Sequence, residues 1–85
     1  MEDDELRRQL ITLTGRFLAL RDIVTRLLAY EASRSGNPEA LFKEFMEDTD
    51  SRVDAFSADK PEYLRALEGV RMEVEFIIAT ARKTL

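Results

Sequence analysis

Apolar residues recur at alternating steps of four and three positions, and this spacing constrains the fold more than any other feature of the chain. The first 34 residues carry an unbroken stripe, formed by Leu6, Leu10, Leu13, Phe17, Leu20, Val24 and Leu27. Two further stripes follow, formed by Phe42, Met46, Thr49, Val53 and Phe56, and by Tyr63, Leu67, Val70, Val74, Ile77 and Ala81. This period is typical of amphipathic helices that pack side by side at a shallow angle. The sequence therefore predicts an all-α fold, an antiparallel three-helix bundle with a long first helix.

The first break between helices lies in the segment from Ser33 to Pro38. Gly36 suits the position after a helix end, where a left-handed conformation is costly for other residues. Asn37 can cap the next helix, and Pro38 suits its first turn, where a backbone N–H has no helical partner. We therefore expect a helix over about 3–34 and the next to begin at 38.

The second break lies in the segment from Ser57 to Glu62. Asp59 as N-cap with Glu62 three residues later predicts a variant capping box, so we expect helices over about 38–56 and 60–84. Residues 48–51 (Asp-Thr-Asp-Ser) are poor helix formers, and the second helix either continues there or breaks near 49–51. The three helices are expected to form a single domain over 1–85.

A chain of 85 residues buries a limited fraction of its surface, so it needs additional stabilisation. It has no Cys and no His, which excludes disulfides, thiolate zinc sites and imidazole catalysis, and leaves oligomerisation. The first and third helices carry apolar residues beyond their stripes, and Gly15 and Ala19 lie one turn apart, where another helix could approach closely. We predict a homodimer whose interface contains Ile11, Gly15, Leu18, Ala19, Met72, Phe76 and Ile78. The alternative is that this face binds a helix of a different protein.

The net charge of −4 is concentrated in the middle of the chain. Residues 35–59 contain seven acidic and two basic residues, which gives −5. No basic surface for nucleic acid is expected, and no apolar run is long enough to span a membrane. An acidic N-terminus is unlike a signal peptide, and the absence of cysteine suits a reducing compartment, so we expect a cytoplasmic protein without a nucleic-acid or membrane partner.

An acidic face on the second helix is the first candidate for chemistry, and it contains Glu44, Glu47, Asp48 and Asp54. The spacing Glu44-x-x-Glu47-x-x-Asp50 resembles part of the metal motif of the all-helical nucleotide pyrophosphohydrolases, and this resemblance implies Mg²⁺ bound by carboxylates. That family has a second acidic set on another helix, which this chain lacks. We interpret the residues as a solvated acidic face open to a basic partner, with no metal and no cofactor.

Arginines on the first and third helices are the second candidate, and they are Arg7, Arg16, Arg21, Arg26 and Arg71. The segments Leu6-Arg7 and Arg16-Phe17-Leu18-Ala19-Leu20 resemble the first helix of the helical chorismate mutases, which implies an anion held by arginine. The second arginine of that family would fall near Val24. We interpret these side chains as flanks of the apolar stripe.

The function that the sequence favours is that of a small non-enzymatic helical protein acting through self-association and protein–protein contact, as a regulator or adaptor. No residue is predicted to be catalytic, since the serines have no histidine to activate them. The alternative is a small all-helical enzyme whose site forms between protomers and binds an anionic metabolite through Arg, or Mg²⁺ through carboxylates.

Overall fold

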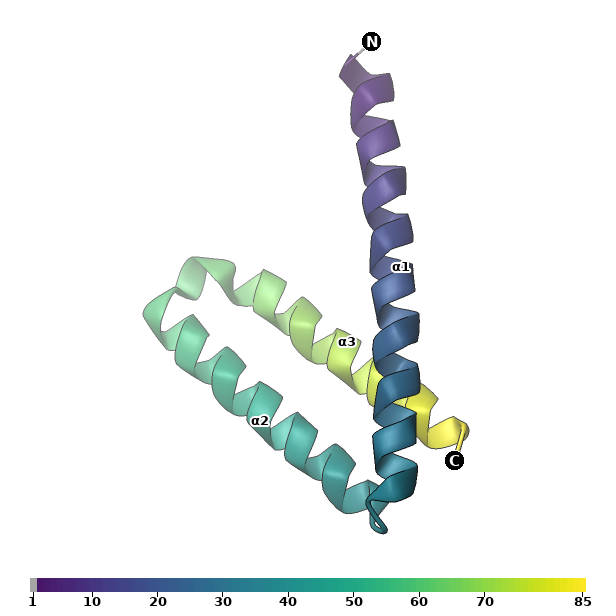
Figure 1. The fold of residues 1–85 in the computed structure, drawn as a ribbon. Helices are drawn as coiled ribbons and strands as arrows, with labels where there is room; N and C mark the ends of the chain where they lie inside the picture. Colours follow the sequence, from purple (N-terminus) through teal and green to yellow (C-terminus); the bar gives the residue numbers. More distant parts are fainter. Residues whose placement is uncertain (1) are drawn as a thin grey trace.

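The computed structural model describes residues 2–85 and contains three α-helices (Figure 1). Helix α1 runs over Glu2–Arg34, α2 over Pro38–Asp59 and α3 over Leu64–Lys83, and a 3₁₀ turn, η1, covers Pro61–Tyr63. No strand occurs among these residues, so the prediction of an all-α fold is confirmed.

The turn between α1 and α2 forms as the sequence predicts. Gly36 adopts a φ of 78°, a left-handed conformation that glycine tolerates best. The Asn37 side-chain oxygen accepts a hydrogen bond from the Ala40 N–H at 3.2 Å, and Pro38 begins the helix. At the end of α1 the Ser35 hydroxyl donates to the Ala32 carbonyl at 2.8 Å, so side chains within the turn satisfy part of the backbone at both helix ends.

The turn between α2 and α3 differs from the prediction. Asp59 is the last residue of α2 and not the N-cap of the next helix, and no side chain caps η1. The Lys60 N–H instead donates to the Phe56 carbonyl at 2.8 Å, which extends the helical hydrogen bonding to that point. Pro61 then ends α2, because a proline disfavours the helical conformation of the residue before it. Helix α2 is continuous through residues 49–51.

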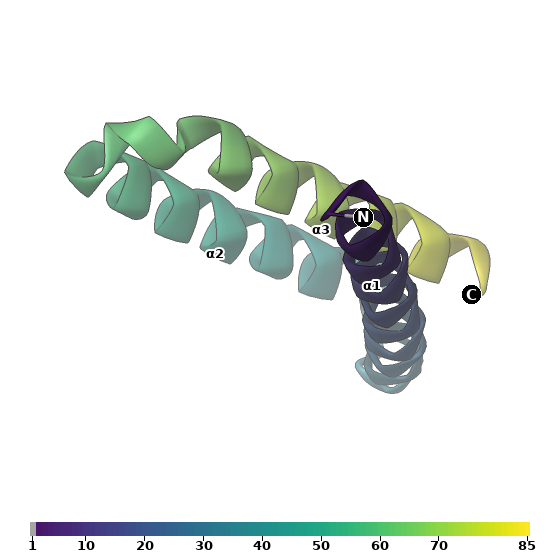
Figure 2. The same ribbon diagram turned by 90° about the horizontal axis from the view of Figure 1, so that it is seen from above.

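Helices α2 and α3 lie side by side and antiparallel, and α1 crosses this hairpin near the end where its own chain turns into α2 (Figures 1 and 2). The first half of α1 extends away from the hairpin without a neighbour. The radius of gyration is 15.8 Å, against about 12 Å for a compact chain of this length. The protomer is therefore open and elongated.

The core is small and lies where all three helices meet. Ala32 from α1, Phe42 from α2, and Ile78 and Ala81 from α3 form it, with partly buried apolar residues around them. Phe42 is 1% exposed and is the largest fully buried side chain. The alanines allow the helices to approach closely at this point, so α1 is fixed to the hairpin of α2 and α3 at this end of the molecule.

The apolar stripe of α1 does not face this core, contrary to the prediction. The buried stripe of α1 instead passes through Thr25, Leu28 and Ala32. Thr25 and Leu28 each follow a stripe residue, Val24 and Leu27, by one position, which is about 100° round the helix. Small side chains at 25, 29 and 32 let the hairpin pack there, and the Thr25 hydroxyl is satisfied by the Arg21 carbonyl at 2.7 Å.

The stripe of α2 faces inward, toward the other helices, for most of its length, as predicted. Phe42 and Val53 are buried and Met46 and Thr49 are half-buried, whereas Phe56 near the end is 47% exposed. The stripe of α3 becomes more buried toward its C-terminal end. Tyr63 and Val70 of that stripe are exposed, as expected for a hairpin whose far end lies away from α1.

Candidate functional site

The N-terminal half of α1 is an apolar segment without a partner. Every described residue from Glu2 to Leu20 is exposed, and we call residues 6–20 the arm. The seven stripe residues of α1, which we call the seam, are between 42% and 63% exposed. The seam runs through the arm and on into the half of α1 that meets the hairpin. A continuous heptad stripe that is exposed over its whole length is typical of a helix that packs against another chain.

A second apolar stripe joins the arm to the core. Ile11 and Leu18 lie at seven-residue spacing ahead of Thr25 and Ala32, so the four residues share one face of α1. The hairpin buries the second pair, whereas Ile11 and Leu18 are 66% and 50% exposed. These two predicted interface residues therefore belong to the stripe that packs on the hairpin, at a point that the protomer's own hairpin does not reach.

Gly15 and Ala19, predicted to permit close helix contact, lie on the side of the arm opposite the seam, and Gly15 adjoins Ile11 and Leu18 of the second stripe. Gly15 follows Leu13 of the seam by two positions, or about 200° round the helix. A Cβ added at Gly15 would meet no atom within 4 Å. In the protomer, therefore, no element uses this glycine for close approach.

The charge of the arm is entirely basic. Residues 6–20 contain Arg7, Arg8 and Arg16 and no acidic residue. All three arginines are exposed. The arm thus combines a wide apolar face with a charge of +3.

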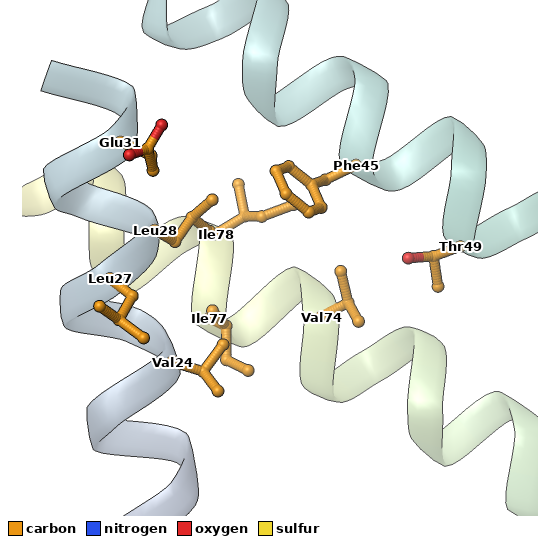
Figure 3. A pocket seen from close by; sticks show the side chains of 9 residues that line it. All are labelled: Val24, Leu27, Leu28, Glu31, Phe45, Thr49, Val74, Ile77 and Ile78. Atoms are coloured by element: carbon orange, nitrogen blue, oxygen red, sulfur yellow. The ribbon is translucent and has the colours of Figure 1, made fainter. Parts of the chain in front are cut away.

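An apolar groove of about 290 Å³ opens beside the core, where α1, α2 and α3 converge (Figure 3). Its lining comes from all three helices and consists of Val24, Leu27, Leu28, Glu31, Phe45, Thr49, Val74, Ile77 and Ile78. Two lining residues, Val24 and Leu27, belong to the seam. Phe45 is 46% exposed although its ring is large and apolar. The groove is therefore an exposed apolar surface that continues directly from the seam.

The margin of the groove is acidic. Glu31 lines it, and Glu44 and Asp48 line an adjoining hollow that shares Phe45 with it. Glu31 and Asp48 make only exposed pairs within their own helices, to Arg34 at 3.6 Å and Arg52 at 3.0 Å. Such pairs contribute little to stability and exchange readily.

The predicted acidic face of α2 divides into two parts. Glu44 makes no ion pair with any residue in 2–85, and Glu47 contacts Lys43 at 3.8 Å on the exposed surface. Asp54 instead accepts a hydrogen bond from Arg71 of α3 at 3.2 Å, and Asp50 accepts a second one from the same arginine at 2.7 Å. Asp54 therefore contributes to the hairpin, whereas Glu44, Glu47 and Asp48 face solvent.

Arg21 connects the middle of α1 to α3. Its guanidinium donates two hydrogen bonds to the Glu73 carboxylate, at 2.5 and 2.6 Å, and lies over the rings of Phe17 and Phe76 at 4.8 and 4.1 Å. The hydrogen bonds to Glu73 raise the pKa of Arg21 above its ordinary value, against the opposing effect of desolvation. The bidentate pair satisfies this arginine within the protomer, so it is not free to bind an anion.

Two further arginines are held in the same way. The hydrogen bonds that Arg71 donates, first to Asp50 and then to Asp54, raise its pKa above the ordinary value against the opposing effect of desolvation. Arg82 donates to both carboxylate oxygens of Glu39, at 2.8 and 3.0 Å, and lies over the buried Phe42 ring at 5.3 Å. Nothing in the spacing of the sequence indicated this last pair, because its members are 43 positions apart.

The predicted interface residues on α3 have different environments. Met72 is 69% exposed, and Phe76 is 49% exposed while it stacks on Arg21. Ile78 does not fit the prediction, since it is 5% exposed and belongs to the core of the protomer. It lines only the floor of the groove. Phe45 and Thr49, which complete that groove, were not predicted as interface residues, because the prediction drew the interface from the first and third helices and these two residues lie on α2.

The described residues give no support for metal chemistry or a membrane span. In residues 2–85, no group of three or more acidic, His or Cys side chains is arranged to hold a metal ion. Within the same range, none of the helices combines the length and apolar character needed to cross a bilayer.

The chain matches no protein family model, no curated protein and no solved structure.

Proposed function

We propose that this protein acts through self-association and protein–protein contact, as a homodimer assembled along α1. The observation that carries the proposal is the exposed seam, seven apolar residues at heptad spacing of which none is less than 42% exposed. Burial of apolar surface is the main favourable contribution to association between helices in water. The seam therefore favours a partner helix.

The exposed area supports the same proposal. The protomer exposes 6994 Å², whereas a folded monomer of 9.8 kDa exposes about 5,200 Å². The excess is about 1,800 Å² per chain. Obligate homodimers bury about 2,000–5,000 Å² in total, and the combined excess of two copies, about 3,600 Å², falls within that range. The excess is as large as a dimer interface requires.

Two of the candidate arginines do not favour the alternative of an enzyme that binds an anion between protomers, because Arg21 and Arg71 are each satisfied by carboxylates of α3 or α2. Arg7 and Arg16 are exposed on the arm. The acidic residues Glu44, Glu47 and Asp48 instead favour contact with a basic protein surface.

Light scattering after size exclusion tests the proposal. We expect the wild-type chain to elute with twice its monomer mass at micromolar concentration. Leu10→Glu places a charge on the seam and should give monomer, whereas Thr12→Glu, also an exposed position on the same turn but outside the seam, should remain dimeric. A wild-type chain that stays monomeric at high micromolar concentration would contradict the proposal.

A further inference from the structure

We propose that the two copies exchange their arms, so that the first part of each arm, from Leu6, lies against the apolar groove of the other copy and beside its acidic margin. This inference rests on the proposed self-association and specifies its geometry. The basic partner of the acidic face on α2 is then the arm of a second copy of this chain.

The first argument is that the arm lacks a surface that a second copy supplies. Ile11 and Leu18 share one face of α1 with Thr25 and Ala32, which are buried on the hairpin. The same face thus packs on α2 and α3 in one half of the helix and has no neighbour in the other half. Within one protomer, α2 and α3 cover Thr25 and Ala32. The α2 and α3 helices of a second copy offer a similar apolar surface to Ile11 and Leu18.

The second argument comes from the direction of the seam. The groove begins at Val24 and Leu27, the last two seam residues. When two α1 helices pair antiparallel with their seams fully overlapping, the two-fold axis passes near Phe17. The first part of each seam then lies beside the last part of the other. This pairing brings each arm to the groove of the other copy and forms a closed two-fold assembly.

The third argument is that charge also favours this arrangement. The acidic first turn, residues 2–5, ends before the arm, and the arm itself carries three arginines and no acid, whereas the hollow beside the groove carries Glu44 and Asp48. The arm and this part of the groove margin are therefore of opposite charge, which favours their contact. In a parallel pair with the seams in register, both grooves would stay open.

The fourth argument concerns stoichiometry. Each chain has one arm and one groove, and both are exposed in the protomer. Reciprocal exchange covers all four surfaces of two copies without leaving an unpaired groove, whereas a different protein on the groove would leave the arms exposed. The excess of about 1,800 Å² per chain is enough for two such contacts in each dimer.

Cross-linking of single-cysteine chains tests the direction of the pairing, and the chain has no cysteine of its own. We would mix tagged Leu6→Cys chains with untagged Leu27→Cys chains and add a bis-maleimide that spans the ~8–10 Å between packed helix axes. We expect a tagged–untagged product. Leu6→Cys alone is the matched control and should give none, because the two positions are about 30 Å apart in the antiparallel pair. Cross-linking of Leu6→Cys to itself, without the mixed product, would overturn the inference.

Mixing two defective chains tests whether the groove takes part. Leu13→Glu disables the arm and Phe45→Glu disables the groove, and both positions are exposed in the protomer, at 62% and 46%. We expect each variant alone to be monomeric at a concentration at which the wild type is dimeric, with unchanged helical content by circular dichroism. The mixture should contain heterodimer, because the intact arm of one chain fits the intact groove of the other.

The outcomes separate the two proposals. A monomeric wild-type chain overturns both of them. A dimer that Phe45→Glu leaves unchanged, or a mixture that remains monomeric, overturns the exchange of arms while the proposed self-association stands.

Discussion

Leu13 offers a quantitative test of the seam. It lies in the middle of the arm and is 62% exposed, with no part in the core of the protomer. Leu13→Ala removes three methyl or methylene groups, each worth about 0.8 kcal/mol when it leaves water. Scaled by the exposed fraction, the loss is about 1.5 kcal/mol per copy, or about 3 kcal/mol per dimer. The dissociation constant should therefore rise about 150-fold.

The assay is sedimentation equilibrium over a range of protein concentrations, with circular dichroism to follow helical content. Leucine and alanine are both strong helix formers, so the arm should remain helical. Thr12→Ala is the matched control on the same turn, and an exposed position outside the interface should change the dissociation constant by about twofold at most. If Leu13→Ala and Thr12→Ala have equal, small effects on a wild-type chain that dimerises, the seam is not the interface.

Three further predictions concern single positions. Gly15→Ala should increase the stability of the protomer by about 0.5–1 kcal/mol in chemical denaturation, because no atom of the protomer lies within 4 Å of the added Cβ; a loss of stability or weaker association would instead support the close contact predicted from the sequence. Phe42→Ala should lower the free energy of unfolding by about 3–5 kcal/mol, since the ring is 1% exposed and fills the centre of the core. A decrease of less than about 1 kcal/mol would show that the core lies elsewhere. Glu73→Gln should lower the melting temperature and reduce its sensitivity to salt, because it removes the carboxylate that pairs with Arg21, whereas Glu75→Gln on the exposed face of α3 should change neither.

Much of the local structure follows from the sequence because it depends on neighbours in the chain. Gly36, Asn37 and Pro38 specify the first turn through their own backbone preferences and one side-chain hydrogen bond. The second turn was predicted incorrectly at Asp59, since two signals competed there. The capping preference of Asp59 favoured a helix start, but α2 continues to that residue and the helix ends only where Pro61 restricts Lys60.

The candidate site was predicted only in part. The sequence indicated surplus apolar surface on α1, and two residues of that surface, Ile11 and Leu18, are exposed in the protomer. It assigned the seam to the core, whereas the structure buries the stripe through Thr25 and Ala32. Heptad spacing reveals that a face is apolar, but not which neighbour covers that face. The groove could not be predicted, because its lining residues come from three helices that meet only in the folded chain.

The sequence by itself determined three helices, the first turn between them, the absence of disulfide and histidine chemistry, and an apolar α1 with more apolar surface than the rest of the chain can cover. Only the tertiary structure decided that the hairpin meets α1 near its C-terminal end, that this contact uses a stripe about 100° from the seam, and that the arm extends free. The physical reason is that helix formation depends on residues within a few positions of one another. The choice between two apolar stripes depends on which one allows closer packing, and Ala32 opposite Phe42, Ile78 and Ala81 allows it on one side of α1 alone.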